Sequence, residues 1–385
     1  MSLVAIAKCD DYEEENVSRA LDEVLAATNG LSFIKSGMTV AIKCNLVSMM
    51  KPGQAATTHP ALVTELCRRI TALGATPVIG DSPGGLYNAA VLSGVYNATG
   101  MHDAEKTGAV LNRNFGSSEA KYPEGVRMRS FTYTSWLDDA DAIINFCKLK
   151  SHGMMGMSAA TKNMFGAIPG ITKPEYHYRF PNAADFADML IDLNEYFKPK
   201  LCIVDAVDGM EGNGPTQGTP RHIGALLASE TPYDLDLICA KLIGLDRSAV
   251  PTLEAAARRG MSVSCAEEVE VAGDVNSFIV SDFKNMKASS NIEFAPKRGG
   301  IFGKVIGKAE ELCLCSRPKV KAKECVGCKK CFDICPAKAI TMVNKVPKID
   351  RSKCIRCFCC QEFCPKGAMK VHRPVIAKML NGKVK

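Results

Sequence analysis

The chain has 385 residues, of which 46% are hydrophobic and 23% charged, and a net charge of +7. A mean hydropathy of −0.01 is typical of a globular protein with an ordinary core. The length indicates two or three domains. No apolar run approaches the roughly 18 residues of a membrane span, so the sequence predicts no membrane segment.

Strand and helix patterns alternate over most of the chain. In chain order we expect a strand over 3–9, a helix over 16–27, a strand over 38–44, a helix from His59 to Gly74, strands over 77–80 and 141–149, a helix over 183–196, a strand over 201–204, and helices over 233–243 and 250–259. This alternation predicts an α/β fold whose largely parallel sheet is flanked by helices.

Near the C-terminus one cysteine motif, Cys-x2-Cys-x2-Cys-x3-Cys-Pro, occurs twice. Its cysteines are Cys325, Cys328, Cys331 and Cys335 in the first copy and Cys354, Cys357, Cys360 and Cys364 in the second. This spacing is that of bacterial ferredoxins with two [4Fe–4S] clusters, in which the fourth cysteine of each motif ligates the other cluster. We therefore expect two clusters in a small α+β domain of bacterial-ferredoxin type, with Cys364 completing the first and Cys335 the second.

Other interpretations of the cysteines are weaker. Two tandem motifs of identical spacing make a poor disulfide framework, and a tetrahedral zinc site would leave the third cysteine of each motif unexplained. Cys359 has no ligand role in the pattern and is predicted to be a small apolar filler. With 18 cysteines and no secretory signal pattern, the sequence favours a reducing cytoplasm, and oxygen-labile clusters favour anaerobic metabolism.

The charge is unevenly distributed. From Arg317 onward the chain holds 18 Lys and Arg but four Asp and Glu, a net charge of +14, which leaves −7 for the rest. No helix-turn-helix or zinc-finger pattern accompanies these lysines, which argues against nucleic acid as a partner. We expect a basic electron-transfer module that meets a redox partner protein, with neither nucleic acid nor membrane as a partner.

Polar or glycine-rich segments follow several predicted strands. Ligands of open α/β sheets bind outside the carboxyl ends of the strands, so these segments should converge on one cleft that suits an anionic ligand. The candidate catalytic residues are His152, Lys150, Lys162, Asp81 and Glu211, and the candidate cofactor-binding residues are Lys43, Asn45, Gly84, Gly85, Lys148, Asn163, Gly212 and Gly214. Simpler roles stay open: Gly84 and Gly85 also fit a plain turn, and His152 also fits a buried structural histidine or a metal ligand.

The same segments resemble the DUF362 family. They are 43–47, 80–85, 148–153, 162–166 and 208–215, and the resemblance spans roughly 41–243. It implies an α/β domain which in many relatives carries a C-terminal two-cluster ferredoxin domain. Cys44 departs from the family pattern, where we would expect proline, and should alter a loop. We therefore expect a DUF362-like domain over 1–290, a linker over 291–317, the ferredoxin-type domain over 318–372 and a tail over 373–385.

Two functions fit these features. In the first, the protein is an iron–sulfur oxidoreductase that passes low-potential electrons from the clusters to an anionic ligand or cofactor in the cleft. Lysines would hold the anion. His152 would donate a proton, and Asp81 and Glu211 would orient His152. In the second, the protein is a non-catalytic electron-transfer adaptor that docks on a partner redox enzyme. A role as a cluster carrier is less favoured because all eight thiolates are committed. An additional flavin or metal in the cleft stays open.

Overall fold

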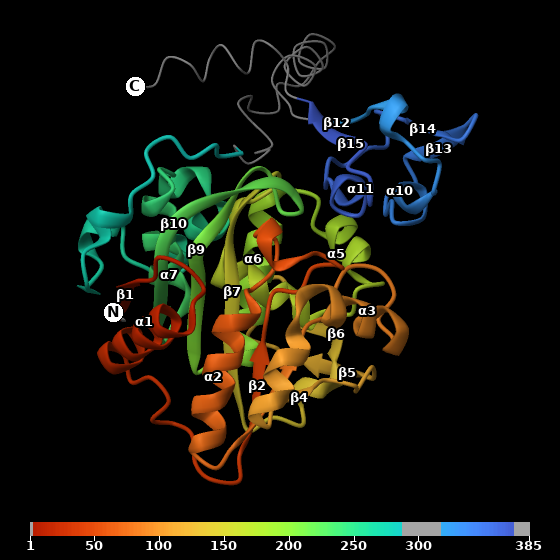
Figure 1. Cartoon of the computed structure of the whole chain (residues 1–385). Coiled ribbons are helices and arrows are strands. Elements are labelled where there is room, and N and C mark those ends of the chain that lie inside the picture. The colour runs from red at the N-terminus through yellow and green to blue at the C-terminus, as the bar shows by residue number, and fades with distance from the viewer. Residues whose placement is uncertain (1–2, 287–316, 373–385) are drawn as a thin grey trace.

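The structure, a computed structural model, describes residues 3–286 and 317–372. Figure 1 shows an α/β domain with a small module at one end of its sheet. We call residues 317–372 the cluster module. The predicted tail and all of the predicted linker except Arg317 lie outside the described residues. Within the described ranges, no helix is both long enough and apolar enough to cross a bilayer.

A nine-stranded sheet forms the centre of the α/β domain. From edge to edge its strands are β11 (Val271–Ala272), β1 (Val4–Lys8), β10 (Gln217–Ser229), β9 (Leu201–Asn213), β7 (Ala142–His152), β2 (Thr39–Lys43), β3 (Thr76–Gly80) and β4 (Val110–Leu111), with β8 (Gly156–Ser158) paired to β7. Strand β10 runs antiparallel to both of its neighbours, and β8 runs antiparallel to β7. The other pairings are parallel, which confirms the predicted fold class.

Helices cover both faces of this sheet. They are α1 (Glu14–Ala27), α2 (Pro60–Ala72), α3 (Ala89–Thr99), α4 (Ala160–Asn163), α5 (Lys173–Arg179), α6 (Ala183–Phe197), α7 (Pro232–Leu242) and α8 (Pro251–Arg258). Alternate strand residues separate the two cores: Ala5 packs with α1 and α2, whereas Ile6 packs with α7. This period of two is what a sheet buried on both faces requires.

The two central strands are longer than the sequence indicated. Strand β7 continues to His152 and β9 continues to Asn213, beyond the predicted strand ends at 149 and 204. Every residue of β7 is buried, including its lysines. Strand β10, helix α3 and the hairpin of β5 (Ser117–Lys121) and β6 (Ser130–Thr134) were not predicted.

The cluster module repeats one small unit. Its elements are β12 (Arg317–Val320), α10 (Lys330–Asp333), β13 (Ile340–Val343), β14 (Val346–Ile349), α11 (Cys359–Glu362) and β15 (Met369–His372). Each short helix follows a residue in the left-handed region, Lys329 with φ 63° and Phe358 with φ 60°. The module is therefore a small α+β domain, as predicted.

Helix α11 holds the module against the end of the sheet. The Thr216 hydroxyl donates to the Glu362 carbonyl at 3.2 Å, and the Gln361 side chain donates to the Asn213 carbonyl at 3.1 Å. Gly84 also contacts the module, because a Cβ atom at this position would lie 1.8 Å from the Phe363 ring. The absence of a side chain at Gly84 is thus explained by close approach of the module.

This contact makes a first prediction. Gly84→Ala should lower the free energy of unfolding by about 1–3 kcal/mol, or loosen the module, because the methyl group overlaps the Phe363 ring. Gly53→Ala is the matched control, since a Cβ atom at Gly53 meets nothing within 4 Å. Urea unfolding and limited proteolysis between the domains check both variants. If Gly84→Ala and Gly53→Ala had the same free energy of unfolding and were cleaved equally fast, the close contact between Gly84 and Phe363 would be contradicted.

Candidate cluster sites and ligand cavity

The eight motif cysteines line two separate spaces in the module. Cys325, Cys328, Cys331 and Cys364 line one, and Cys335, Cys354, Cys357 and Cys360 line the other. This grouping matches the expected exchange of the fourth cysteine between the motifs. The fourth cysteine of each motif also accepts a backbone hydrogen bond at 3.2 Å, Cys335 from Ala339 and Cys364 from Ala368. Such donors stabilise the charge of a ligating thiolate.

The donor chemistry of both spaces fits a [4Fe–4S] cluster. Among residues 3–286 and 317–372, no three His, Cys, Asp or Glu side chains converge on one point as the ligands of a single ion do. A cubane cluster does not require this convergence, because each thiolate binds a different iron. Four motif cysteines line each space, which is the number of thiolates that a [4Fe–4S] cluster takes.

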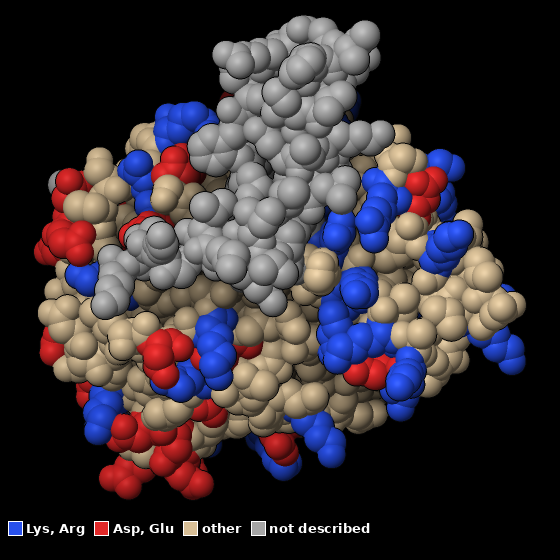
Figure 2. Space-filling model, turned by 90° about the horizontal axis from the view of Figure 1, so that it is seen from above, with Lys and Arg blue, Asp and Glu red and all other residues tan. Residues whose placement is uncertain are grey.

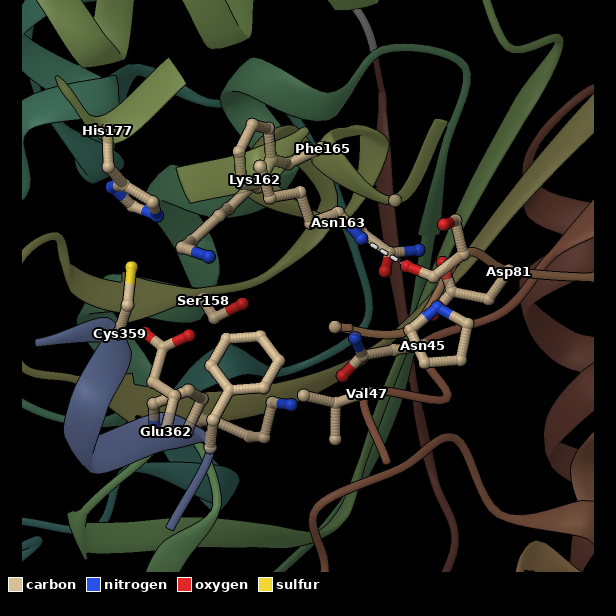
Figure 3. Close-up of a pocket in the computed structure, with 18 of the residues that line it drawn as sticks. Asn45, Val47, Asp81, Ser158, Lys162, Asn163, Phe165, His177, Cys359 and Glu362 are labelled. Carbon is tan, nitrogen blue, oxygen red and sulfur yellow. Dashed lines mark hydrogen bonds between the residues drawn. The ribbon is translucent and has the colours of Figure 1, made fainter. Parts of the chain in front are cut away.

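A polar cavity lies between the module and the carboxyl ends of the central strands (Figure 3). The α/β domain contributes Lys150, Lys162, Lys173, Ser158 and His177, among others, and the module contributes Cys359, Glu362 and Phe363. In Figure 3 the side chains of Lys162, Ser158, Glu362 and Cys359 point toward the same space. The cavity is thus built by both domains.

Three lysines make the cavity electropositive: Lys150 is buried, and Lys162 and Lys173 are half-buried. Lys150 donates to the Ala56 carbonyl at 2.7 Å, and Lys173 donates to the Ser82 carbonyl. The Lys162 ammonium lies 5.8 Å from the centre of the Phe165 ring and has no hydrogen-bond or ion-pair partner among the described residues. Burial lowers the pKa of all three, to about 7 for Lys150 and for Lys173.

His152 and Glu362 form a pair that crosses the domain boundary. The Nδ1 atom of His152 accepts from the backbone N–H groups of Met154 and Met155 at 3.1 and 3.2 Å, so the neutral ring carries its proton on Nε2. Nε2 lies 3.2 Å from the Glu362 carboxylate. Burial lowers the pKa of His152 to about 4. Burial alone would raise the pKa of Glu362, but the neighbouring His152 ring and the charge of Lys162 outweigh it and lower the pKa to about 2.

Two further polar atoms at the cavity lack partners within the described part of the chain. They are Nδ1 of His177, whose ring stacks on Phe186 with centroids 4.5 Å apart, and Oδ1 of Asn45. Buried polar atoms are rarely left unpaired, because each costs about 1–3 kcal/mol. Together with Lys162 they indicate room and demand for a polar ligand.

Six of the thirteen predicted cleft residues line the cavity. Asn45, Asp81, Gly84, Lys150, Lys162 and Asn163 line it. Lys43 lies directly behind, in a buried ion pair with Asp81 at 2.8 Å. His152 reaches the cavity through Glu362.

Other predicted residues lie elsewhere, and their placement corrects the sequence interpretation. Lys148 does not line the cavity; it forms a buried ion pair with Asp205 at 2.6 Å. Glu211 pairs with Lys284 at 3.1 Å, so the carboxylate beside His152 is Glu362 instead.

Three predicted cofactor-binding glycines also lie off the cavity lining, namely Gly85, Gly212 and Gly214. Packing explains Gly214, whose Cβ atom would lie 1.9 Å from the Ser151 carbonyl oxygen. Gly85 and Gly212 have φ of 95° and 78°, which glycine adopts without strain.

Sequence reasoning missed several lining residues. Lys173, Ser158 and Phe363 carried no motif that would single them out. Glu362 is one of four acidic residues after Arg317 and lies between two motif cysteines, which was an available signal. Cys359 was predicted to be a filler and is buried, yet it lines both the ligand cavity and the space of the second cysteine set.

The cavity is small. Its free volume is about 70 Å³, whereas a single water needs about 10–15 Å³ of such space and pockets for drug-sized ligands usually reach about 300–1,000 Å³. A flavin therefore does not fit the cavity as it stands. A few water molecules or a small anion do.

The fold and the two cysteine sets define a protein in which a ferredoxin-type module closes a cavity at the end of an α/β sheet. Residues 317–365 match the 4Fe-4S dicluster domain, which supports iron–sulfur clusters and points to electron transfer. Residues 40–241 match the domain of unknown function DUF362. The chain belongs to the DUF362 family.

Among characterised sequences, the chain is 28% identical over 299 residues to the thylakoid-associated protein sll1697 of Synechocystis sp., covering 77% of this chain and 91% of that protein. Two solved structures align more loosely. They are the lactate racemase apoprotein from Thermoanaerobacterium thermosaccharolyticum (14% identity, TM-score 0.35, 53% of this chain and 50% of that one) and a protein from Thermotoga maritima (11% identity, TM-score 0.34, 56% of both chains). The chain thus spans about half the length of each, and scores this low carry no argument about function.

Proposed function

We propose that this protein is an iron–sulfur oxidoreductase that delivers electrons to a small anion bound in the cavity between its domains. When bound, two [4Fe–4S] clusters would supply one-electron transfers at low potential. The cysteine sets described above would hold them. The remaining question is what the protein's own residues do at the cavity.

One observation carries the proposal: Cys359 lines both the cavity and the space of the second cysteine set. Cys357, which is one of that set, lies two residues before it and lines the same space. A ligand in the cavity would therefore be one buried side chain away from the second cluster. A plain adaptor has no need for a closed electropositive cavity at this position.

The charges favour a small anion as the ligand. Lys150, Lys162 and Lys173 line the cavity, where Glu362 is a counter-charge and Asp81 is already paired with Lys43. The ammonium of Lys162 is half-buried and has no partner among the described residues, and an anion would give it a charge-assisted hydrogen bond. The volume limits the anion to a few heavy atoms, such as a short carboxylate or an inorganic oxyanion.

Lysines are also the better proton donors here. His152 is neutral near pH 7, and its Nε2–H faces Glu362. Lys150 and Lys173 have pKa values lowered to about 7, where a general acid is most effective. In the proposed reaction each electron that reduces the anion is accompanied by one proton, which leaves a lysine ammonium as neutral amine. His152 would position Glu362.

Lys162 provides the direct test. Acetate, bicarbonate and phosphate are titrated singly into dithionite-reduced protein, and the electron paramagnetic resonance spectrum is recorded. We expect at least one anion to change the spectrum, with an apparent affinity at least about tenfold weaker in Lys162→Met, because the unpartnered ammonium is lost. Lys35→Met removes an exposed lysine and should bind like the wild type. No response to any of the three anions, or equal affinities in both variants, would contradict the proposal.

The pH dependence of anion binding follows from the same lysines. The groups that face Lys150 and Lys173 are Lys162, Asp81 and Glu362, and for Lys173 also Lys43. A lysine binds an anion while it is protonated, so binding is complete below its pKa and is lost as the pH rises through it. A bound cluster adds negative charge and would raise these two pKa values. We therefore expect the affinity for the anion to fall between about pH 7 and 9, whereas the pKa of an ordinary lysine is about 10.4. Constant affinity up to pH 9.5 would contradict this assignment.

A further inference from the structure

The two cysteine sets differ in their surroundings. The second set faces the α/β domain: Cys360 is buried, and its neighbour Cys359 lines the ligand cavity. In the first set Cys331 is buried too, but Cys328 is exposed, whereas no cysteine of the second set is exposed. Helix α11 contacts the α/β domain through Gln361 and Glu362, and α10 lies beside α11 in the module (Figure 1).

Apolar side chains are exposed beside Cys328. Val326 is 60% exposed and lines the same space as Cys328, and Phe332 on α10 is 41% exposed. Large exposed apolar side chains that cluster on a small domain mark a surface that another molecule covers. We call Val326, Cys328, Lys329, Lys330 and Phe332 the outer face.

The outer face is basic. Lys329 and Lys330 are exposed, and Lys366 lines the same space as Cys328. Asp333 is the exposed acid nearby, while Glu324 is held by Lys321 at 3.0 Å. Figure 2 shows Lys and Arg side chains gathered on the side of the molecule where the module lies. Lysines around an apolar centre favour an acidic protein partner and speed its encounter.

We propose that the outer face is the surface on which an acidic electron-carrier protein docks, so that electrons enter at the first cysteine set and leave through the second toward the cavity. Cys325, Cys328, Cys331 and Cys364 would hold the cluster that accepts one electron from the carrier, with no bond made or broken. The inference rests on the proposed function, but its test measures docking and does not involve the cavity.

A basic groove elsewhere on the module provides a matched control. Lys348 and Arg351 are exposed there, and the groove is also lined by Cys354 of the second set. The variant Lys329→Glu/Lys330→Glu reverses two charges on the outer face. The variant Lys348→Glu/Arg351→Glu makes the same change in net charge at the groove. Iron content and absorbance show whether each variant retains its clusters.

Binding of an oxidised acidic flavodoxin is measured by calorimetry at about 20 mM and 200 mM salt. We expect the outer-face variant to bind at least about tenfold more weakly than the wild type at low salt, and the groove variant to change less than about threefold. The rate of reduction by reduced flavodoxin should follow the same order, while reduction by methyl viologen radical, a small cation, should not slow in either variant.

Three results would overturn the proposal: no flavodoxin binding by the wild type at low salt, a larger loss in the groove variant, or equal losses in both. A wild-type protein that docks the carrier but ignores every anion would leave the docking surface standing and refute the function of the cavity. The two proposals therefore fail separately.

Discussion

Replacing Cys360 by serine is expected to remove one of two clusters, leaving no more than about four of about eight irons per chain. Replacing Cys359, one residue earlier, should leave all of them. The reason is the motif spacing: both residues line the space of the second cysteine set, but only Cys360 is a motif position, whereas Cys359 also lines the ligand cavity. Iron and sulfide analysis of anaerobically purified protein makes the comparison.

Double variants test the exchange of the fourth cysteine. Cys335 and Cys360 line the same space, so their joint replacement should cost one cluster and leave about four irons. Cys364 lines the other space, so replacing Cys335 and Cys364 together should cost both clusters. Loss of both clusters from the Cys335/Cys360 variant would show that each motif supplies four ligands to its own cluster.

The second large effect is expected at the ion pair of Lys148 and Asp205. Both side chains are fully buried, and the Lys148 ammonium also donates to the Tyr12 hydroxyl at 2.9 Å. Asp205→Asn removes one charge and leaves the buried ammonium uncompensated. We expect a loss of about 3–5 kcal/mol in the free energy of unfolding, measured by urea denaturation, because breaking one side of a buried pair is strongly destabilising.

Two further variants separate the pair from its surroundings. Lys148→Met combined with Asp205→Asn should be less destabilised than the sum of the single variants, because no unpaired charge remains. Asp10→Asn breaks an exposed pair, with Lys8 at 2.9 Å, and should cost at most about 1 kcal/mol. An Asp205→Asn loss as small as that of Asp10→Asn would show that Lys148 is not held as a buried charge.

The features that depend on local spacing could be predicted from the sequence. The cysteine motifs needed only their own spacing, and most strands and helices followed from hydrophobic periodicity within short windows. The end of strand β7 could not be predicted in this way, because Lys148, Lys150 and His152 look like exposed polar residues in the sequence. They are buried because Asp205, the Ala56 carbonyl and Glu362 meet them, and these partners lie far away in the sequence.

The cavity itself depends on contacts between the domains, which a sequence does not display. Glu362 and Cys359 were assigned to the cluster motif alone, and nothing local shows that they face another domain. Strand β10 was missed for a related reason: its first half, Gln217 to His222, is polar and forms a strand because it pairs with β9. The glycines near the end of β9 also suggest a loop, because the sequence does not display their pairing with β10.

The central claim is that the cavity between the domains holds a small anion beside the second cluster. Native mass spectrometry of protein purified without oxygen tests it most directly, with iron, sulfide and released small molecules quantified. We predict about eight irons, about eight sulfides and one small anion per chain, with the anion absent from Lys162→Met. Wild-type protein with both clusters and no anion beyond that of the variant would contradict the claim and favour an electron-transfer adaptor.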